Sequence, residues 1–286
     1  NQITRTYYIE DMCDNPAVCQ QTITIADIDL ETYVYLEGSM INPGGVETYT
    51  PVMRTSLNAL KVLPGQSYYN FLTGLVSSPV GQPYSGAPWN YGGTEGAAYS
   101  SGGDAGYNSG VTDWVLVSLR IAPDAPPLCQ KACLLHNDGT VEFTNGGFDC
   151  CELSHDTAYF VVIEHRDHLI VMSPDSIPVV NGTMTFDFRF TQSYINDPFG
   201  FGGVGQKELL PDLPGVFAMY TANGNQTNNS SSDVDINSDD QTYWGNQNST
   251  IGRYRNGDYN LNGDCNYNDR TTFEFNNGLF TTVPRY

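Results

Sequence analysis

The chain has 286 residues, enough for one large or two ordinary domains with a sizeable core. Its 12 basic and 32 acidic residues give a formal net charge of −20, which argues against nucleic acid and anionic membranes as partners and favours cations. No apolar run approaches the roughly 20 residues of a membrane-spanning helix, so no membrane insertion is expected.

Residues 1–28 predict a β-ribbon of two strands, residues 3–10 and 20–27, joined by a turn region that holds Cys13 and Cys19. Three pieces of this segment resemble the last strands of a hyalin-type repeat, an immunoglobulin-like sandwich of large bacterial surface proteins: Ile3-Thr-Arg-Thr-Tyr7, Asp11-Met-Cys-Asp-Asn-Pro-Ala-Val-Cys19 and Ile23-Thr-Ile-Ala-Asp27. Two such strands lack the strands that would cover their apolar face. Candidates for that face are Tyr7, Ile9, Ile23 and Ile25.

Residues 29–215 predict a mainly β domain, an antiparallel β-sandwich of jelly-roll or immunoglobulin-like type. Residues 183–190 alternate without a break, so Met184, Phe186, Phe188 and Phe190 are expected in the core. The other expected elements, in chain order, are a strand at 32–37, a short helical or irregular piece at 51–62, an aromatic-anchored packed loop at 79–110, a buried strand at 113–121, and a hairpin of strands 159–164 and 169–172.

Motifs in this region resemble a β-sandwich module of secreted Bacteroidetes proteins, which typically precedes a dockerin-like tail in repeat-built adhesins exported by a type IX route. The resemblance covers roughly residues 31–286 and implies location and architecture rather than an activity. It rests on these motifs: Leu36-Glu-Gly38, Met53-Arg54, Pro83-Tyr84, Pro88-Trp-Asn-Tyr-Gly-Gly-Thr-Glu95, Asp113-Trp-Val-Leu-Val-Ser-Leu-Arg120, Leu134-Leu-His-Asn-Asp-Gly139 and Ile163-Glu-His-Arg-Asp-His168.

The cysteines predict an oxidising, extracellular compartment, because close pairs in an acidic chain rich in Asn, Gly and Tyr favour disulfides over zinc. We expect Cys13 to bond Cys19 and Cys265 to be reduced and buried. The set Cys129 and Cys133 is expected to bond the set Cys150 and Cys151, with the connectivity open. A zinc site made of these last four cysteines is the alternative, but adjacent cysteines chelate one metal poorly.

The stretch 258–269 has the pattern of a calcium loop. Side-chain oxygens stand at the first, third and fifth places (Asp258, Asn260, Asn262), Gly263 is sixth and Asp269 is last. A hard cation such as Ca²⁺ takes six to eight oxygens, and this alternation turns them inward. We expect the backbone carbonyl of Asp264 as a further ligand, and a helix at 270–277 that Asp269 opens. A polar Asx-rich turn without metal is the alternative.

A shift of 29 residues superposes a second loop and helix on this one, with Asp235 on Asp264, Asp240 on Asp269 and Trp244 on Phe273. Residues 216–286 therefore resemble a dockerin-like pair, the duplicated calcium module of bacterial extracellular proteins. The early ligands of the first loop are either Asn229, Ser231 and Asp233 without a gap, or Asn223 and Asn225 with 228–232 as an insertion. We favour the insertion, because Asn-Gly-Asn resembles the usual loop start of that family.

Catalytic signatures are scarce. His165 and His168 could ligate a metal, but on a hairpin turn they are not expected to share a face, so polar residues that hold the hairpin are the favoured interpretation. No Gly-x-Ser-x-Gly elbow is present, and no pair of carboxylates stands out for glycoside hydrolysis. The aromatic residues of the Gly-rich loop could stack on a glycan, although such residues more often plug the rim of a sandwich: Trp89, Tyr91, Tyr99 and Tyr107.

Thr157 and Ser176 lie in short Asp-Ser/Thr-apolar patterns that look like Bacteroidetes O-glycosylation sites and also arise by chance.

The sequence as a whole favours a non-enzymatic, calcium-stabilised extracellular structural or adhesive protein that self-associates through its N-terminal strands. The alternative is a carbohydrate-binding module. Asn1 in place of Met suggests processing or a trimmed chain. If residue 1 marks such a cut inside a longer adhesin, the alternative to self-association is a ribbon that folds back on its own sandwich.

Overall fold

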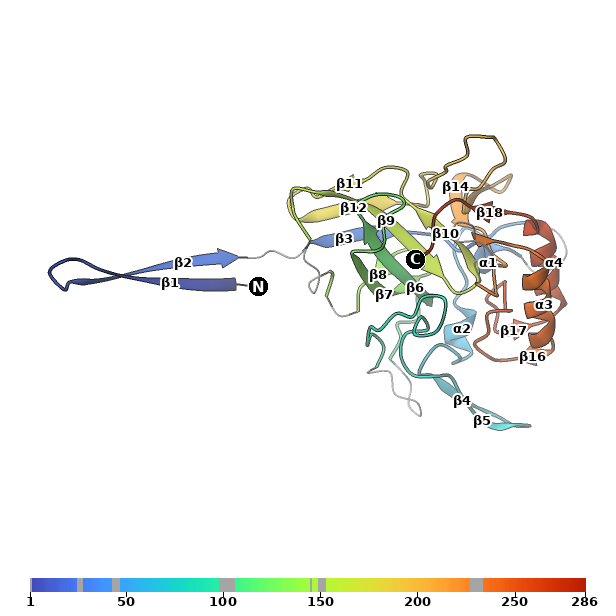
Figure 1. Cartoon of the computed structure of the whole chain (residues 1–286). Coiled ribbons are helices and arrows are strands. Elements are labelled where there is room, and N and C mark those ends of the chain that lie inside the picture. The colour runs from blue at the N-terminus through green and yellow to red at the C-terminus, as the bar shows by residue number, and fades with distance from the viewer. Residues whose placement is uncertain are drawn as a thin grey trace.

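The computed structural model describes residues 2–24, 28–42, 47–97, 106–144, 146–148, 153–226 and 234–286. Within these residues the chain is mainly β, with several antiparallel sheets and four short helices (Figure 1). No helix among them is long and apolar enough to cross a membrane.

The N-terminal ribbon forms and stands apart from the body of the molecule (Figure 1), but its second strand begins at Pro16 and not at residue 20, so Cys19 lies in the strand and not in the turn. β1 (Gln2–Glu10) pairs antiparallel with β2 (Pro16–Thr24), and Tyr7 lies opposite Cys19. Every residue from 4 to 21 is exposed. Ile25 lies outside the described residues, and the side chain of Ile23 is not described.

The centre of the body is an antiparallel sheet with the strand order β10-β9-β6-β7-β8, and β11 pairs with the far end of β9. All ten residues of β6 are buried, so this strand is covered on both faces, as the apolar run at 113–121 predicts. The strands are β6 (Val111–Arg120), β7 (Cys129–His136), β8 (Val141–Glu142), β9 (Ala158–His165), β10 (His168–Met172) and β11 (Ile177–Pro178).

Alternate residues of β9 reach two different cores. Val161 and Ile163 join the larger core, while Val162 joins a second core that the C-terminal segment completes. The elements that contribute to the larger core or pack against it are β3 (Asp29–Tyr33), α1 (Glu37–Met40), α2 (Ser56–Ala59), β4 (Ser67–Asn70), β12 (Thr183–Asp187), β13 (Gln206–Leu209) and β14 (Leu213–Met219). β5 (Gly74–Ser77) pairs with β4.

One strand departs from the predicted antiparallel arrangement, because β12 pairs parallel with β3. Met184 and Phe188 are fully buried as expected, Phe186 is half-buried, and Phe190 is exposed. The strand ends at Asp187, whose carboxylate binds the Arg189 guanidinium at 2.7 Å. Phe190 lies three residues beyond the end of the strand and does not reach the core.

The loop at 79–110 is packed where it is described. The Tyr84 ring is fully buried, meets Trp89 edge-on at 5.0 Å, and its hydroxyl donates to the carbonyl of Trp114. Tyr107 meets Trp114 in the same way at 6.3 Å. These contacts confirm an aromatic-anchored loop.

The C-terminal segment contains the predicted duplication. α3 (Ser238–Gln247) and α4 (Tyr267–Asn276) have the same length, start 29 residues apart, and follow the equivalent N-caps Asn237 and Asn266, each with a capping box. Short strands frame them: β15 (Val234–Asp235) pairs with β18 (Phe280–Thr281), and β16 (Thr250–Ile251) pairs with β17 (Asp264–Cys265).

Candidate metal centre and the buried network beside it

The loop at 258–264 curls around its own side-chain oxygens. The two carboxylate oxygens of Asp258 accept from the backbone N–H groups of Asn262 at 3.0 Å and Gly263 at 2.7 Å. The amide oxygen of Asn260 accepts from Asn262 N–H at 3.1 Å, and that of Asn262 accepts from Asp264 N–H at 2.8 Å. Gly263 has a φ of +91°, a conformation that its missing Cβ allows.

Asp269 ties the end of the loop to its beginning. One carboxylate oxygen accepts from Asn260 N–H at 3.1 Å and the other from Asn266 N–H at 2.7 Å. α4 begins at Tyr267 rather than after Asp269, so the predicted helix start is wrong: Asp269 lies in the first helical turn, inside the capping box. The Asp264 side chain accepts from Gly252 N–H at 3.0 Å instead of facing the loop interior.

The two acids of this loop are held in a setting that is unfavourable for negative charge. Asp258 and Asp269 are both fully buried. Burial, reinforced by the neighbouring Asp269, raises the pKa of Asp258 well above its usual range. Burial also raises the pKa of Asp269 to about 7, although backbone N–H groups oppose this. A cation between these two adjacent buried carboxylates would offset their mutual repulsion and the cost of burying their charge.

These oxygens fit Ca²⁺ better than a softer metal, because all of them come from carboxylates and amides. The residues that would hold the ion are Asp258, Asn260, Asn262 and Asp269, with the backbone carbonyl of Asp264. Arg54 lies beside them and bonds the backbone carbonyls of Asn260 and Gly38, so it helps to hold the loop.

The first loop repeats the same contacts where it is described. Asn225 N–H donates to Asp240 at 3.1 Å and Asn237 N–H donates to it at 2.8 Å, as Asn260 and Asn266 do to Asp269. Asn225 therefore takes the place of Asn260. This equivalence supports the alignment with an insertion, although residues 227–233, which contain that insertion and the ungapped ligands, lie outside the described residues.

The electrostatics of the first loop are milder. Burial raises the pKa of Asp240 to about 6, and Asp235 is only half-buried, accepting from the Asn237 side chain. Asn223 is fully buried, and neither of its side-chain polar atoms has a hydrogen-bond partner in the part of the chain that the structure describes. Asn223 thus offers an unused amide oxygen beside Asp240 and Asn225.

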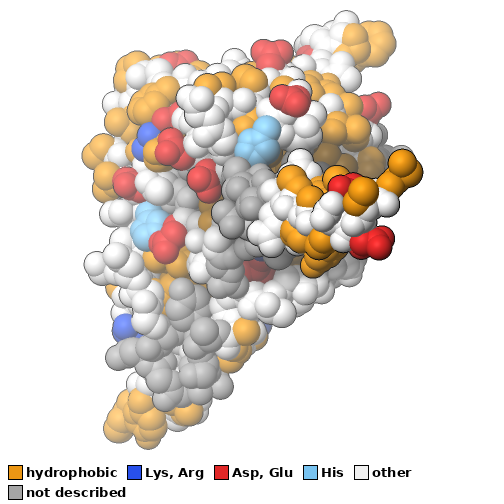
Figure 2. Space-filling view, turned by 90° about the vertical axis from the view of Figure 1, so that its left-hand side faces the viewer, with side chains coloured by type: hydrophobic (Ala, Val, Ile, Leu, Met, Phe, Trp, Pro, Cys, Tyr) orange, Lys and Arg blue, Asp and Glu red, His pale blue; other side chains and the backbone are white. Residues whose placement is uncertain are grey.

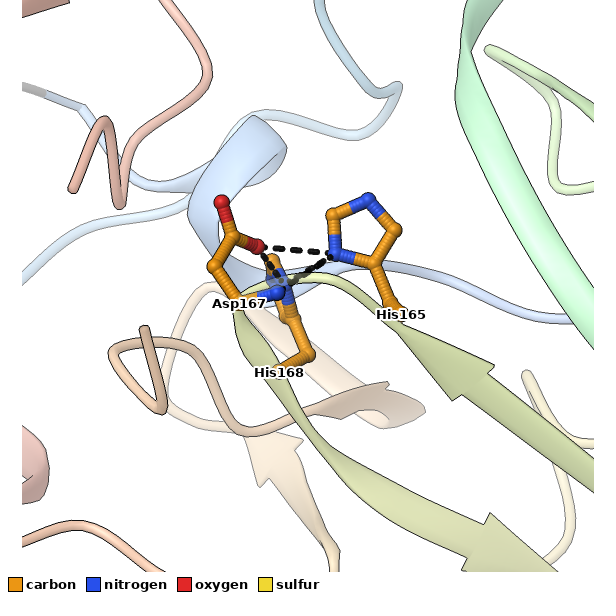
Figure 3. A group of neighbouring side chains, drawn as sticks. All are labelled: His165, Asp167 and His168. Atoms are coloured by element: carbon orange, nitrogen blue, oxygen red, sulfur yellow. Dashed lines mark hydrogen bonds and ion pairs between the residues drawn. The ribbon is translucent and has the colours of Figure 1, made fainter. Parts of the chain in front are cut away.

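The turn between β9 and β10 carries a second cluster of polar side chains, and it is wholly buried (Figure 3). His165 and His168 face each other with 2.9 Å between their Nδ1 atoms, so the expectation that they cannot share a face is wrong. His168 lies directly opposite His165 in the β9–β10 register, so both rings stand on the same face of the hairpin. Asp167 Oδ1 lies 2.8 Å from His165 Nδ1 and 2.5 Å from His168 Nδ1.

These short separations fit hydrogen bonding and not a shared metal ion. Two ligands on a tetrahedral zinc stand about 3.3 Å apart. The Nε2 of His168 is also occupied, because it accepts from Gly38 N–H at 3.2 Å. The favoured interpretation, polar residues that hold the hairpin, agrees with these contacts.

Asp113 and Arg166 complete this network. Asp113 Oδ2 lies 3.2 Å from His165 Nε2 and 3.1 Å from Arg166 Nε, and its other oxygen accepts from the Tyr254 hydroxyl at 2.6 Å. Burial alone would lower the pKa of His165, but Asp167 and Asp113 outweigh it and raise that pKa. Burial lowers the pKa of His168. Sequence reasoning missed Asp113, although an acid in a strand rich in Val, Leu and Trp was a signal.

The expected Cys13–Cys19 disulfide is wrong: both thiols are free and exposed. The ribbon register sets Cys19 opposite Tyr7, whereas Cys13 lies in the turn beyond the strand ends. Cys129 is disulfide-bonded, while Cys133 is free and buried. Cys150 and Cys151 lie outside the described residues. Cys265 is free and buried, as expected.

The aromatic residues considered for glycan stacking are half-buried and bonded to the body. Trp89 donates to Glu164, Tyr91 to Glu95, and Tyr107 to the carbonyl of Pro64. These three rings anchor the loop to the body and do not form an exposed stacking surface. Tyr99 lies outside the described residues. Thr157 and Ser176, the candidate glycosylation sites, are half-exposed.

No protein-family model matches the chain, and comparisons with curated proteins and with solved structures find no match.

Proposed function

We propose that this chain is a non-enzymatic subunit of an extracellular fibre or matrix, with a β-sandwich body and a calcium-stabilised, dockerin-like C-terminal module at 216–286. Copies assemble when the N-terminal ribbon of one adds strands to the next. The observation that carries this proposal is the β1–β2 hairpin, whose residues 4–21 are all exposed.

A bare hairpin of this kind is a poor final state for a chain. An isolated two-stranded ribbon is marginally stable in water, and its outer edges expose unpaired N–H and C=O groups. Large apolar side chains add to this: Tyr8 is 80% exposed, Ile9 65% and Val18 59%. Addition to a sheet of another copy would satisfy the edges and cover these side chains. Such a contact joins different surfaces, so it can propagate into a filament.

A calcium site in the loop at 258–269 would support the proposed extracellular location. Extracellular modules bind Ca²⁺ with dissociation constants near its external concentration, roughly 10⁻⁴ to 10⁻³ M. The buried pair Asp258 and Asp269 would gain most from such an ion. The disulfide at Cys129 also fits an oxidising compartment.

Removing residues 1–27 tests the proposal. The full chain should form polymers in calcium buffer, seen by electron microscopy and sedimentation, whereas the truncated chain should stay a monomer. Its melting temperature should match that of the full chain, because the removed strands contact nothing else among the described residues.

A Cys13→Ser variant is the matched control, since it changes the turn of the ribbon but keeps both strands; it should still assemble. If the truncated chain forms the same fibres, or if the full chain stays monomeric at high concentration, strand addition by this segment is wrong.

A further inference from the structure

A second hairpin, β4–β5, also presents an uncovered apolar face. Its inner residues Tyr68 and Val76 face the body, and Val76 is buried. The outward pair Tyr69 and Leu75 is 75% and 67% exposed, and the tip residues Phe71 and Leu72 are 91% and 88% exposed. β4–β5 projects at the lower end of the molecule in Figure 1, and Figure 2 shows hydrophobic side chains gathered at the lower end.

This hairpin lies in a segment without charge. No Asp, Glu, Lys or Arg occurs between Lys61 and Glu95, although the chain carries a net charge of −20. Two copies of so acidic a chain repel each other over most of their surfaces, so a contact between copies is least costly where charge is missing. β2 (Pro16–Thr24) is likewise free of charged residues, whereas β1 contains Arg5 and Glu10.

The base of the hairpin is firmly seated. The Tyr68 hydroxyl donates a hydrogen bond to the carbonyl of Gly252 at 2.8 Å. The same hydroxyl accepts one from the Arg253 guanidinium at 3.2 Å. Among the described residues, β4 and β5 pair only with each other. The hairpin therefore offers an open strand edge on a fixed support.

We propose that β5 is the acceptor for the ribbon of a neighbouring copy, with β2 of that copy pairing along the outer edge of β5. Tyr69, Phe71, Leu72 and Leu75 pack against its apolar side chains. This inference rests on the proposed function and names the surface that receives the ribbon. Because donor and acceptor lie on different parts of one chain, each added copy exposes a new acceptor and growth continues.

Cross-linking tests the contact, because the ribbon carries a natural probe in the exposed thiol of Cys19. In a Cys13→Ser background, a Leu75→Cys variant treated with a short bis-maleimide under assembly conditions should give a ladder of covalent oligomers on a denaturing gel. Ile121→Cys, 57% exposed after β6, is the matched control and should give no ladder. A ladder from Ile121→Cys but not from Leu75→Cys would overturn the proposal.

Substitution gives an independent measurement. Tyr69→Ser with Leu75→Ser should raise the concentration needed for assembly at least tenfold and leave thermal unfolding of the body nearly unchanged. Phe199→Ser with Phe201→Ser removes equally exposed rings, 79% and 78%, from another loop and should assemble normally. If deletion of residues 1–27 abolishes assembly while the Tyr69/Leu75 variant assembles normally, the acceptor is wrong and strand addition stands. If the deleted chain still assembles, the proposed function itself fails.

Discussion

Asp258 and Asp269 are fully buried acids whose pKa values are raised, yet both are surrounded by backbone N–H donors. Those donors suit the charged form, while burial opposes it. A bound divalent cation would remove this conflict, because it would neutralise both carboxylates at once. We therefore expect the loop to be ordered most firmly with Ca²⁺ bound.

Asp258→Ala should abolish calcium binding at the second loop, because both of its oxygens are turned into the loop. Asp240→Ala in the first loop should have a smaller effect. At a concentration of about 100 times its dissociation constant, the ion would stabilise the wild type by about 2.7 kcal/mol. Calorimetric titration and melting with and without chelator measure both quantities, with exposed Asp124→Ala as the control. Melting and protease resistance that chelation leaves unchanged in the wild type would contradict a calcium site.

His165 and His168 predict a pH optimum for stability. The raised pKa of His165 means that its contribution is full below 6.5 and is lost as the pH rises through the folded-state value. The lowered pKa of His168 means that stability is lost as the pH falls below 6.5. The free energy of unfolding should therefore have a maximum near pH 6.5 and decline at both lower and higher pH.

His165→Gln should remove the decline on the alkaline side and keep the acid one, at a cost of about 3–5 kcal/mol for breaking a buried ion pair. Exposed His155→Gln should keep both limbs of the profile. An alkaline limb that persists in His165→Gln would show that another group is responsible.

At the scale of elements, α1 and the loop at 258–264 are in very close contact. A Cβ on Gly38 would lie 2.0 Å from the carbonyl oxygen of Tyr259, which is backbone and cannot move away easily. Gly38→Ala should therefore lower both the melting temperature and the calcium affinity. Gly245→Ala is the matched control: it has open space in α3 and should stabilise slightly, by about 0.5–1 kcal/mol. Equal melting temperatures for the two variants would contradict this packing.

The disulfide pattern is a second prediction at this scale. A non-reducing peptide map should link Cys129 to Cys150 or Cys151, and should recover Cys133 and Cys265 as thiols that react only after unfolding. Cys13 and Cys19 should react with a thiol reagent in the folded protein. A map with Cys265 in a bridge would contradict the buried loop.

For the whole molecule, the C-terminal segment at 216–286 packs directly against the body. Trp244, Phe273 and Ile236 share a core with Leu169 and Ile170 of β10. Asn276 at the end of α4 donates to the buried Glu37 at 2.6 Å. The segments 29–215 and 216–286 are therefore coupled in folding.

Scanning calorimetry should show one unfolding transition for residues 28–286, and chelation should shift this transition as a whole to lower temperature. Independent modules would give two peaks, of which only one responds to chelator. The variant without residues 1–27 should give the same profile, because the ribbon contributes nothing to these cores.

The sequence by itself determined the local features: the ribbon, the buried strand at 113–121, and the duplicated loop and helix with their 29-residue spacing. Such features depend on alternation, turn residues and caps, all of which act within a few residues. The ring of loop oxygens around Asp258 and Asp269 was predictable for the same reason, since these residues lie within twelve positions of each other.

Tertiary structure alone decided which distant residues meet. The pairing of Asp113 with His165 and Arg166, the parallel register of β12 on β3, and the position of the helices against β10 depend on how the chain folds back over long separations. The Cys13–Cys19 prediction failed because nearness in sequence does not fix strand register. The sequence also did not predict the exposed face of β4–β5. Its apolar residues look like core residues in the sequence, and only the tertiary structure shows that the core leaves them out.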